Sequence, residues 1–222
     1  MTFGDCYDEP IWRYCAISAW FVQMGVHEGL HAFEAHRRGD PTADMLGKRT
    51  INPLAHIEFG NPMSLIATVV LPVVTVFYLD LGIALGMAWV PINPRHFRRP
   101  YRDWAMVSLA GPFGNLLLCT VCLVVHFGVL RWLPESRSVA AVETLFCSIY
   151  ITSVIYGFFN LIPVPPLDGS RVIYWLGGPA VRGLFDQIQP FGFLLVLVMF
   201  QVLPGVGAAF HGLIGLFTWA YV

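Results

Sequence analysis

The stretch Val26-His27-Glu28-Gly29-Leu30-His31 lies inside a long apolar segment and reads H-E-x-x-H. Residues four apart share one face of a helix, so the imidazoles of His27 and His31 can reach a single metal ion. Glu28 follows the first histidine and could accept a proton from metal-bound water. Ionisable groups within an apolar span are costly and by default mark a functional site. The stretch therefore predicts a metal site at membrane depth.

The composition of the whole chain agrees with this setting. Of its 222 residues, 56% are hydrophobic and 12% are charged, whereas about a quarter of the residues in soluble domains are charged. We therefore expect an integral membrane protein whose main partner is the lipid bilayer. The basic residues lie in loops between apolar segments, and the absence of a concentrated basic face argues against binding nucleic acid. The first ten residues are acidic, which argues against a cleavable signal peptide.

Three apolar segments are long enough to cross a hydrocarbon core, which takes roughly 20 residues. They are Ile11 to about Ala35, Trp104 to about Leu130, and Val142 to Ile162. Arg37 and Arg38 follow the first segment, so the positive-inside rule places residues 36–62 in the cytoplasm and the N-terminus outside. The H-E-x-x-H then lies towards the cytoplasmic half of the membrane.

Two regions leave alternatives open. Residues 63–90 are apolar but interrupted, and basic residues flank them on both sides, so they form either a re-entrant hairpin or two shortened helices. Residues 190–222 form either one bent span or a helical hairpin around Pro204-Gly205. The prediction is an all-α polytopic membrane protein with about five to six membrane segments. Short extended pieces are expected in the cytoplasmic loops, and residues 1–222 are expected to form a single membrane-embedded domain.

A catalytic zinc usually takes three protein ligands and leaves one position for water. Few acidic residues are available at membrane depth to complete the set. Asp168 is the best candidate because it follows two prolines, precedes a glycine and lies at the cytoplasmic end of a span. Asp80 is the competitor, and its alternative interpretation is a solvated turn at the membrane face.

Three separated motifs together resemble the site-2 proteases, a family of membrane-embedded zinc metalloproteases that cleave proteins within the membrane. These motifs are His27-Glu28-Gly29-Leu30-His31, the A-G-P-x-x-N of Ala110 to Asn115, and the N-x-x-P-x-P-x-L-D-G of Asn160 to Gly169. The loop Asn52-Pro53-Leu54-Ala55-His56 and the run from Val90 to Arg98 resemble a compact bacterial branch without a PDZ or appended regulatory domain. The resemblance covers roughly residues 15–180.

The resemblance implies a role for each matching residue. His27, His31 and Asp168 would bind one Zn²⁺ per chain, and Glu28 would be the general base. Asn160 would hold the substrate carbonyl or its oxyanion, and His56 would act similarly from its loop. Substrates would be single-span transmembrane proteins, unwound at the site and met as an added strand near the prolines. The chain departs from the branch after His56, where Glu58-Phe59 replaces an acidic-proline pair.

Other interpretations remain for several residues. The pair Cys119 and Cys122 is expected to serve as small packing residues in a helix rather than as a redox or metal site. Asn115 is expected to support close helix packing, and the tryptophans near span ends, including Trp89 and Trp104, to be interfacial anchors. A membrane metal transporter and a non-cleaving pseudoprotease remain as alternative functions. The expected location is the plasma (inner) membrane of a bacterium.

Overall fold

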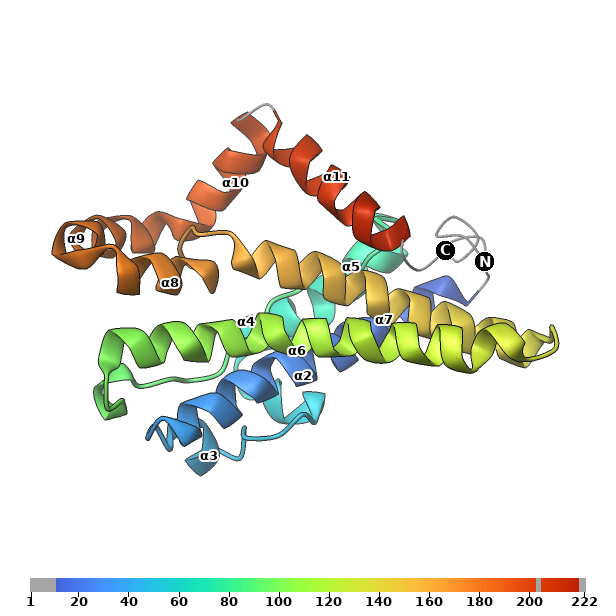
Figure 1. Cartoon of the computed structure of the whole chain (residues 1–222), viewed down its shortest axis with the longest axis horizontal. Helices are drawn as coiled ribbons and strands as arrows, with labels where there is room; N and C mark the ends of the chain where they lie inside the picture. Colours follow the sequence, from blue (N-terminus) through green and yellow to red (C-terminus); the bar gives the residue numbers. More distant parts are fainter. Residues whose placement is uncertain (1–10, 203–204, 220–222) are drawn as a thin grey trace.

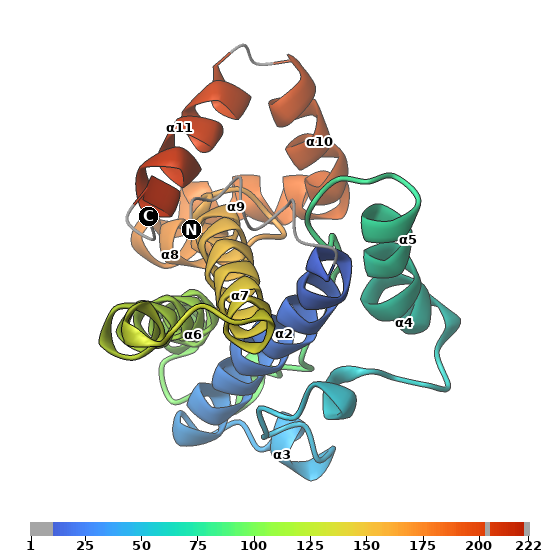
Figure 2. The ribbon, with the colours of Figure 1, turned by 90° about the vertical axis from the view of Figure 1, so that its right-hand side faces the viewer.

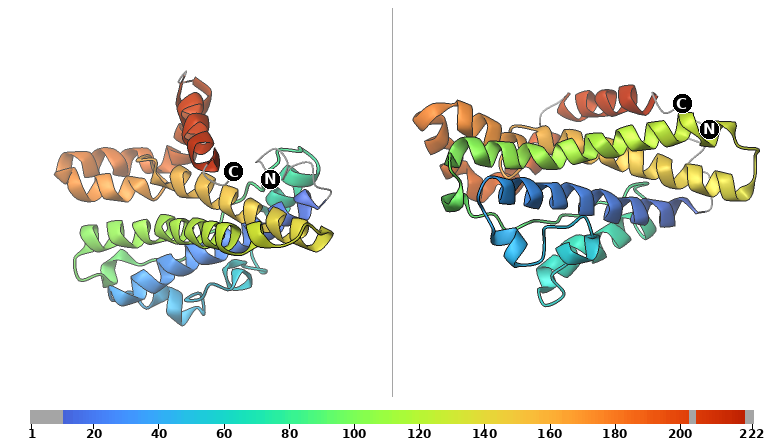
Figure 3. Two further views of the ribbon diagram at one scale, coloured as in Figure 1. Left: turned by 45° about the vertical axis from the view of Figure 1, so that its right-hand side comes forward. Right: turned by 60° about the horizontal axis from the view of Figure 1, so that its bottom comes forward.

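Three long helices form the centre of the computed structural model, which describes residues 11–202 and 205–219. They are α2 (Trp12–Arg37), α6 (Pro100–Gly128) and α7 (Arg137–Leu161), and each packs against the other two. Figures 1 and 3 show them running side by side along the long direction of the molecule. The buried core combines small side chains such as Ala16 and Ala19 with the large rings of Trp20 and Tyr150. This close packing brings distant parts of the chain to one site.

Local sequence explains where these helices begin and end. α2 ends at Arg37, and two residues later Gly39 has a positive φ of 106°, which suits a residue without a side chain; the amide of Asp40 then bonds the carbonyl of Ala35 at 3.0 Å. Ser136 caps the start of α7 by accepting a hydrogen bond from the amide of Val139 at 3.2 Å. α7 ends before Ile162-Pro163 because the residue before a proline disfavours the helical conformation.

Two helices are long and apolar enough to cross a membrane. These are Pro100–Trp132, which is α6 with its following turn, and Arg137–Leu161, which is α7. The expected first span is also a single helix, α2, but it contains Arg13, Glu28 and Glu34 and is not one of these two. These two helices agree with the predicted membrane protein, and the crossing of the membrane by α2 stays a prediction.

The region 63–90 consists of two short helical pieces joined by a π-helical turn and followed by a non-helical return, and its re-entry into the membrane stays a prediction. The helical part comprises α4 (Pro62–Leu65), a π-helical turn (Ile66–Val70) and α5 (Leu71–Phe77). The amide of Met87 then bonds the carbonyl of Ala67 at 3.0 Å, so the return runs back along the helix. Figure 2 shows α4 and α5 on the opposite side of α2 from α6.

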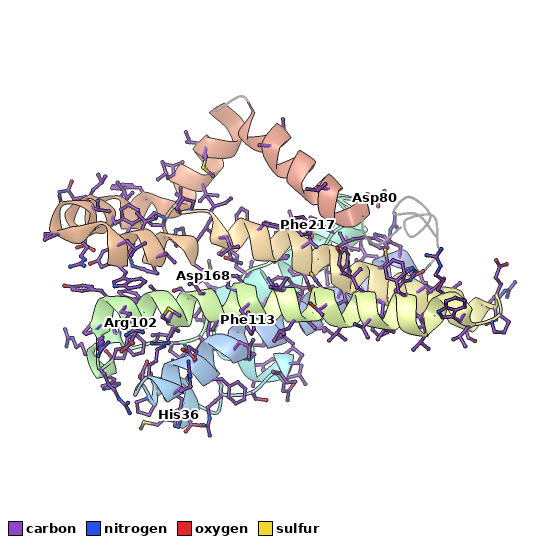
Figure 4. All side chains as sticks on the ribbon, in the orientation of Figure 1. His36, Asp80, Arg102, Phe113, Asp168 and Phe217 are labelled. Carbon is purple, nitrogen blue, oxygen red and sulfur yellow. The ribbon has the colours of Figure 1, made fainter. Side chains whose placement is uncertain are left out.

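The tip of this hairpin lies beside the beginning of α2. The indole of Trp12 donates to the carbonyl of Gly82 at 2.9 Å, and Arg13 pairs with Asp80 at 3.1 Å. Arg13 and His27 are 14 residues apart in one helix, or roughly 21 Å at 1.5 Å per residue. Asp80 is therefore far from the histidines, and its competing role as a metal ligand is wrong. Figure 4 labels Asp80 and Asp168 at well-separated places.

The remaining helices complete the fold. The loop after α2 contains α3 (Thr42–Met45) and a 3₁₀ turn (Pro53–His56); the expected extended pieces form no strand, although the backbone is extended at Asn52 and Ile57. After α7 come α8 (Gly169–Leu176) and α9 (Gly178–Ile188), and α8 packs on α6. α10 (Gly192–Val202) and α11 (Val206–Trp219) are two helices rather than one bent span, and they form a V in Figure 1. The described residues contain no β-strand.

Candidate metal centre

The two histidines of the H-E-x-x-H lie on one face of α2 with their metal-binding atoms together. The Nε2 atoms of His27 and His31 are 3.1 Å apart, and the rings meet edge to face at 4.7 Å between centroids. Both side chains are buried, with 5% and 6% of their surface exposed. The helical spacing of four residues produces this arrangement, as the sequence predicts.

Asp168 completes a cluster of three candidate ligands. Its Oδ2 atom lies 3.3 Å from Nε2 of His27 and 3.3 Å from Nε2 of His31. One ligand atom from each of the three residues can be chosen so that all three lie within 4.8 Å of one another. A tetrahedral site with metal–ligand distances of about 2.0–2.1 Å separates its ligand atoms by roughly 3.3–3.4 Å. The spacing and the two-nitrogen, one-carboxylate donor set therefore fit a catalytic zinc.

The loop after α7 delivers Asp168 to this position. Its turns are closed by bonds from the amide of Val164 to the carbonyl of Ile162 at 2.8 Å and from Leu167 to Val164 at 2.9 Å. A side chain at Gly169 would meet the backbone of the α7 end, including the carbonyl oxygen of Ile162 at 2.9 Å. The L-D-G sequence therefore needs a glycine because the chain folds back tightly onto α7.

A hydrogen bond to α6 sets the orientation of His31. Nδ1 of His31 lies 2.7 Å from the carbonyl oxygen of Val107. Because a carbonyl can only accept, Nδ1 carries the proton and Nε2 has a free lone pair for a metal. Outer hydrogen bonds of this kind fix the tautomer of metal-binding histidines. Nδ1 of His27 is buried without a hydrogen-bond partner in the described part of the chain.

Gly111 of the A-G-P motif makes room for both imidazoles. A Cβ atom at Gly111 would lie 2.6 Å from Nε2 of His27 and would also overlap the ring of His31. Close packing at this motif is confirmed, and it takes the form of the α6 backbone lying against the side chains of His27 and His31. A glycine at this position therefore lets the α6 backbone approach both candidate ligands closely.

Asn115 of the same motif is part of a buried pair. It is 1% exposed and accepts a hydrogen bond from Nε2 of Gln23 at 3.2 Å. Gln23 lies one turn before His27, so Gln23, His27 and His31 form a polar stripe at spacing i, i+4, i+8. Sequence reasoning did not single out Gln23, although this spacing was a usable signal. Asn115 supports helix packing, as expected, through a polar contact.

A cavity of about 480 Å³ opens beside the candidate ligands and contains the other predicted site residues. Glu28, which is 8% exposed, and Asn160 both line it together with His27, His31 and Asp168. Nδ2 of Asn160 donates to the carbonyl of Tyr156 at 3.0 Å. An amide nitrogen carries two hydrogens, so a second donor remains on Asn160. The cavity therefore combines three candidate ligands, a carboxylate and an amide.

His56 has a different position. It is 1% exposed, its Nε2 lies 2.9 Å from the carbonyl oxygen of Thr50, and it is not among the residues that line the cavity. The loop that carries it crosses α2 at two glycines: Cβ atoms at Gly25 and Gly29 would overlap the backbone of Ile51 and Thr50. His56 thus has a contact within its loop and does not line the cavity, but it lies near enough to Glu28 and His31 for their charges to act on its imidazole, and its role towards the substrate stays a prediction.

The return of the hairpin supplies one wall of the cavity. The hydroxyl of Tyr156 accepts from the amide of Gly86 at 2.8 Å, and the stretch from Gly86 to Val90 lines the space. Trp89 and Trp104 also line it, so their predicted role as simple interfacial anchors misses a contribution to the site. Arg171 is a further lining residue that the sequence analysis did not single out.

Comparison with known proteins gives consistent names. The chain is 34% identical over 187 residues to the "Putative zinc metalloprotease YwhC" of Bacillus subtilis (strain 168), a match that covers 81% of this chain and 76% of that protein. It is 28% identical over 200 residues to the "Putative zinc metalloprotease Rip2" of Mycolicibacterium smegmatis, covering 89% and 70%. The protein of the same name from Mycobacterium tuberculosis (strain H37Rv) is 27% identical over 202 residues. No family profile and no solved structure matches the chain.

Proposed function

Because the chain belongs to the site-2 protease family, we propose that it is a zinc metalloprotease that hydrolyses peptide bonds of transmembrane proteins within the membrane. One observation carries the proposal: three candidate ligands, Glu28 and Asn160 line a single cavity. The names of the relatives support zinc as the metal. We further propose that residues 1–222 act as one domain with one zinc ion.

His27, His31 and Asp168 would hold the metal, since one ligand atom from each of them already lies within 4.8 Å of the others. A bound zinc supplies Lewis acidity and lowers the pKa of a coordinated water. The hydrogen bond from Nδ1 of His31 to the carbonyl of Val107 leaves Nε2 of His31 available to bind the metal. Gly111 leaves room for both imidazole rings. The carboxylate of Asp168 makes this site less positive than one with three histidines.

Glu28 would act as the general base. It follows His27 directly on α2, and its largely buried carboxylate lines the cavity. A carboxylate there can take the proton of the attacking water and then transfer it to the nitrogen of the leaving amine. The free N–H of Asn160 would donate to the oxygen of the attacked carbonyl, where negative charge develops.

Single-span transmembrane proteins are the proposed substrates. A transmembrane helix has its carbonyls hydrogen-bonded internally, so it must unwind before one of them can be attacked. The cavity is walled by the non-helical stretch from Gly86 to Val90 and by the proline-rich segment at Pro166 and Leu167. Non-helical backbone of this kind favours binding of an extended substrate segment through main-chain hydrogen bonds.

The proposed setting is the plasma (inner) membrane, with the site towards the cytoplasm and the N-terminus outside. The arginines at the end of α2 and the start of α6 support this orientation. Single cysteines introduced at Asp44 and Ser136, in a background without native cysteines, should react with an impermeant maleimide from opposite sides of the membrane. Labelling of both from one side would contradict the orientation.

The decisive test of activity is a cleavage assay. Purified zinc-loaded protein should cut members of a panel of single-span helices, and Glu28→Gln should reduce the rate by roughly 10²–10⁴-fold, as expected for loss of a general base. Glu135→Gln is the matched control, because it makes the same change at an exposed residue in the loop between α6 and α7. Equal activity of wild type and Glu28→Gln would refute the mechanism.

The two alternative functions give different results. A metal transporter would move zinc across the liposome membrane and would leave every single-span helix of the panel uncut. A pseudoprotease would bind helices without cutting them. The presence of both Glu28 and Asn160 in the cavity favours the protease, because neither alternative requires a base and an amide donor beside the metal ligands.

A further inference from the structure

A cationic side chain lines the cavity close to the metal centre. Arg171 lies on α8, three residues after Asp168, and its guanidinium carbon is 3.9 Å from the centre of the Trp104 ring on α6. Both residues line the cavity. Arg171 is the one lysine or arginine among the described residues that line the cavity, and the acidic residues among them are Glu28 and Asp168.

Arg171 forms no salt bridge with a carboxylate of the described residues, although the charges of Asp168 and Asp186 act on it from further away. No acidic oxygen lies within 4.0 Å of its nitrogens in the described part of the chain, and its one hydrogen bond is a long contact of 3.5 Å to Gln189. Arg38, by contrast, binds Glu34 at 2.5 Å and Asp103 at 2.6 Å. Burial lowers the pKa of the Arg171 guanidinium, but a guanidinium remains protonated in proteins, so a fixed positive charge faces the cavity.

The surrounding structure holds this guanidinium in place. Arg182 of α9 stacks on Tyr101 at 3.7 Å and donates to the carbonyls of Tyr174 and Trp175 at 3.0 and 3.1 Å. These contacts join the α8–α9 pair to the start of α6, beside which it lies in Figure 1. Arg171 therefore belongs to a helix, α8, that the contacts of Arg182 join to α6.

Stacking determines which atoms of the guanidinium remain available. The guanidinium carbon lies over the Trp104 ring at 3.9 Å from its centre, and the N–H groups of a guanidinium lie in its plane, at its edge. In-plane N–H pairs match the two oxygens of a carboxylate, and such bidentate contacts are shorter and stronger than neutral hydrogen bonds. An unpaired, stacked arginine is thus a preformed carboxylate receptor.

We propose that Arg171 is a specificity-determining residue that binds an acidic side chain of the substrate near the cleaved bond. This inference rests on the proposed function and adds a substrate class to it: transmembrane segments with an Asp or Glu near the cytoplasmic end. The receptor shares its cavity with Glu28 and Asn160, so its ligand is a residue of the bound peptide. A phosphate of an anionic lipid has the same oxyanion chemistry and is the competing source.

The experiment measures binding to the zinc-loaded Glu28→Gln protein in vesicles, so that it does not depend on cleavage. Labelled single-span peptides carry Asp, Asn or Lys in turn at each position of their cytoplasmic half. At one position the Asp peptide should bind about tenfold more tightly than the Asn peptide, as expected for a charged hydrogen bond. Arg171→Gln should abolish this difference, and Arg171→Glu should favour Lys.

The controls separate specificity from folding. Arg102→Gln removes an exposed charge from the same end of α6, where Figure 4 labels Arg102, and should retain the preference for Asp. Zinc content verifies that each variant is folded. If Arg171→Gln does not fold, Arg171→Lys retains the charge without the planar fork and should weaken the preference.

Three results would overturn the inference: no preference for Asp at any position, a preference that survives Arg171→Gln, or an equal loss for Asp and Asn peptides seen only in vesicles containing phosphatidylglycerol. The last result would assign the guanidinium to a lipid phosphate. Failure of the wild type to cleave any peptide would refute the protease instead, and the charge preference would still be measurable.

Discussion

Nδ1 of His31 lies 2.7 Å from the carbonyl oxygen of Val107, and this contact joins α2 to α6 at the metal centre. It belongs to a set of three α6 features that meet the polar stripe of α2, the others being Gly111 against the imidazoles and Asn115 against Gln23. The ligands come from α2 and the start of α8, but α6 determines how they are oriented.

The ligand set predicts which aspartate holds the metal. Asp168→Asn should lower bound zinc well below one ion per chain, because a neutral amide is a poor replacement for a carboxylate ligand. Asp80→Asn should retain zinc, since Asp80 lies beside Arg13 at the other end of the α2 segment. Metal analysis of the purified variants checks both, and loss of zinc from Asp80→Asn alone would exclude Asp168 as the third ligand.

Gly111→Ala should displace the histidines. The new methyl group would lie 2.6 Å from Nε2 of His27, so the rings or α6 must move, at a cost of about 1–3 kcal/mol for an overpacked site. We expect reduced zinc content and a lower unfolding temperature. Gly128→Ala is the matched control on the same helix, because its Cβ would meet nothing within 4 Å. Normal zinc binding by Gly111→Ala would show that the space beside the rings is not needed.

Gln23 and Asn115 should be energetically coupled. Each is buried, and the 3.2 Å hydrogen bond between them crosses from α2 to α6. Removing either side chain leaves the other without its partner, at a cost of about 1–3 kcal/mol. The Gln23→Ala, Asn115→Ala double variant should therefore lose less than the sum of the two single losses. Unfolding in detergent measures all three, and strictly additive losses would rule out the coupling.

Asp40 should make stability depend on pH in the acid range. Burial by itself raises the pKa of its carboxyl, but hydrogen bonds from Thr42 and His96, with a further one from the amide of Asn93, outweigh burial and hold the pKa below its usual range. The folded-state pKa is thus lower than the unfolded value of about 3.9. The resulting stabilisation is present above that value and is lost as the pH falls towards the folded-state pKa.

Asp40→Asn tests this prediction. At neutral pH the variant should be less stable than the wild type, because the charged acceptor and its contact with His96 are gone. Below about pH 4 the difference should shrink, since the wild-type carboxyl is then increasingly protonated. Thermal unfolding at several pH values measures the difference. A constant difference from pH 7 to the acid range would contradict the assignment to Asp40.

Much of the site could be predicted from residues that are close in sequence. The period of the helix brings His27 and His31 together and places Glu28 beside them, whatever the rest of the chain does. The prolines before Asp168 and the glycine after it predict a non-helical turn at the end of a span, and the structure contains that turn. Resemblance to a family then connected these segments across more than a hundred residues.

The hairpin of residues 63–90 shows why the rest could not be predicted. Its apolar composition with interruptions suits two short helices as well as one helix and an extended return. Tertiary contacts determine the course of the return, namely Gly86 against Trp20 and Pro72, and Tyr156 against the backbone of the return. The same packing places the tip at Arg13 and thereby excludes Asp80 from the metal centre.

Sequence by itself therefore determined the chemical groups of the site, because ligand type and helical spacing are local properties of the chain. The tertiary structure decided which groups meet: Asp168 rather than Asp80 joins the histidines, His56 does not line the cavity, and Gln23, Trp104 and Arg171 take positions around it. Those choices depend on how α2, α6 and α7 pack, and close approach at glycines such as Gly111 is a property of two segments together that neither sequence pattern contains alone.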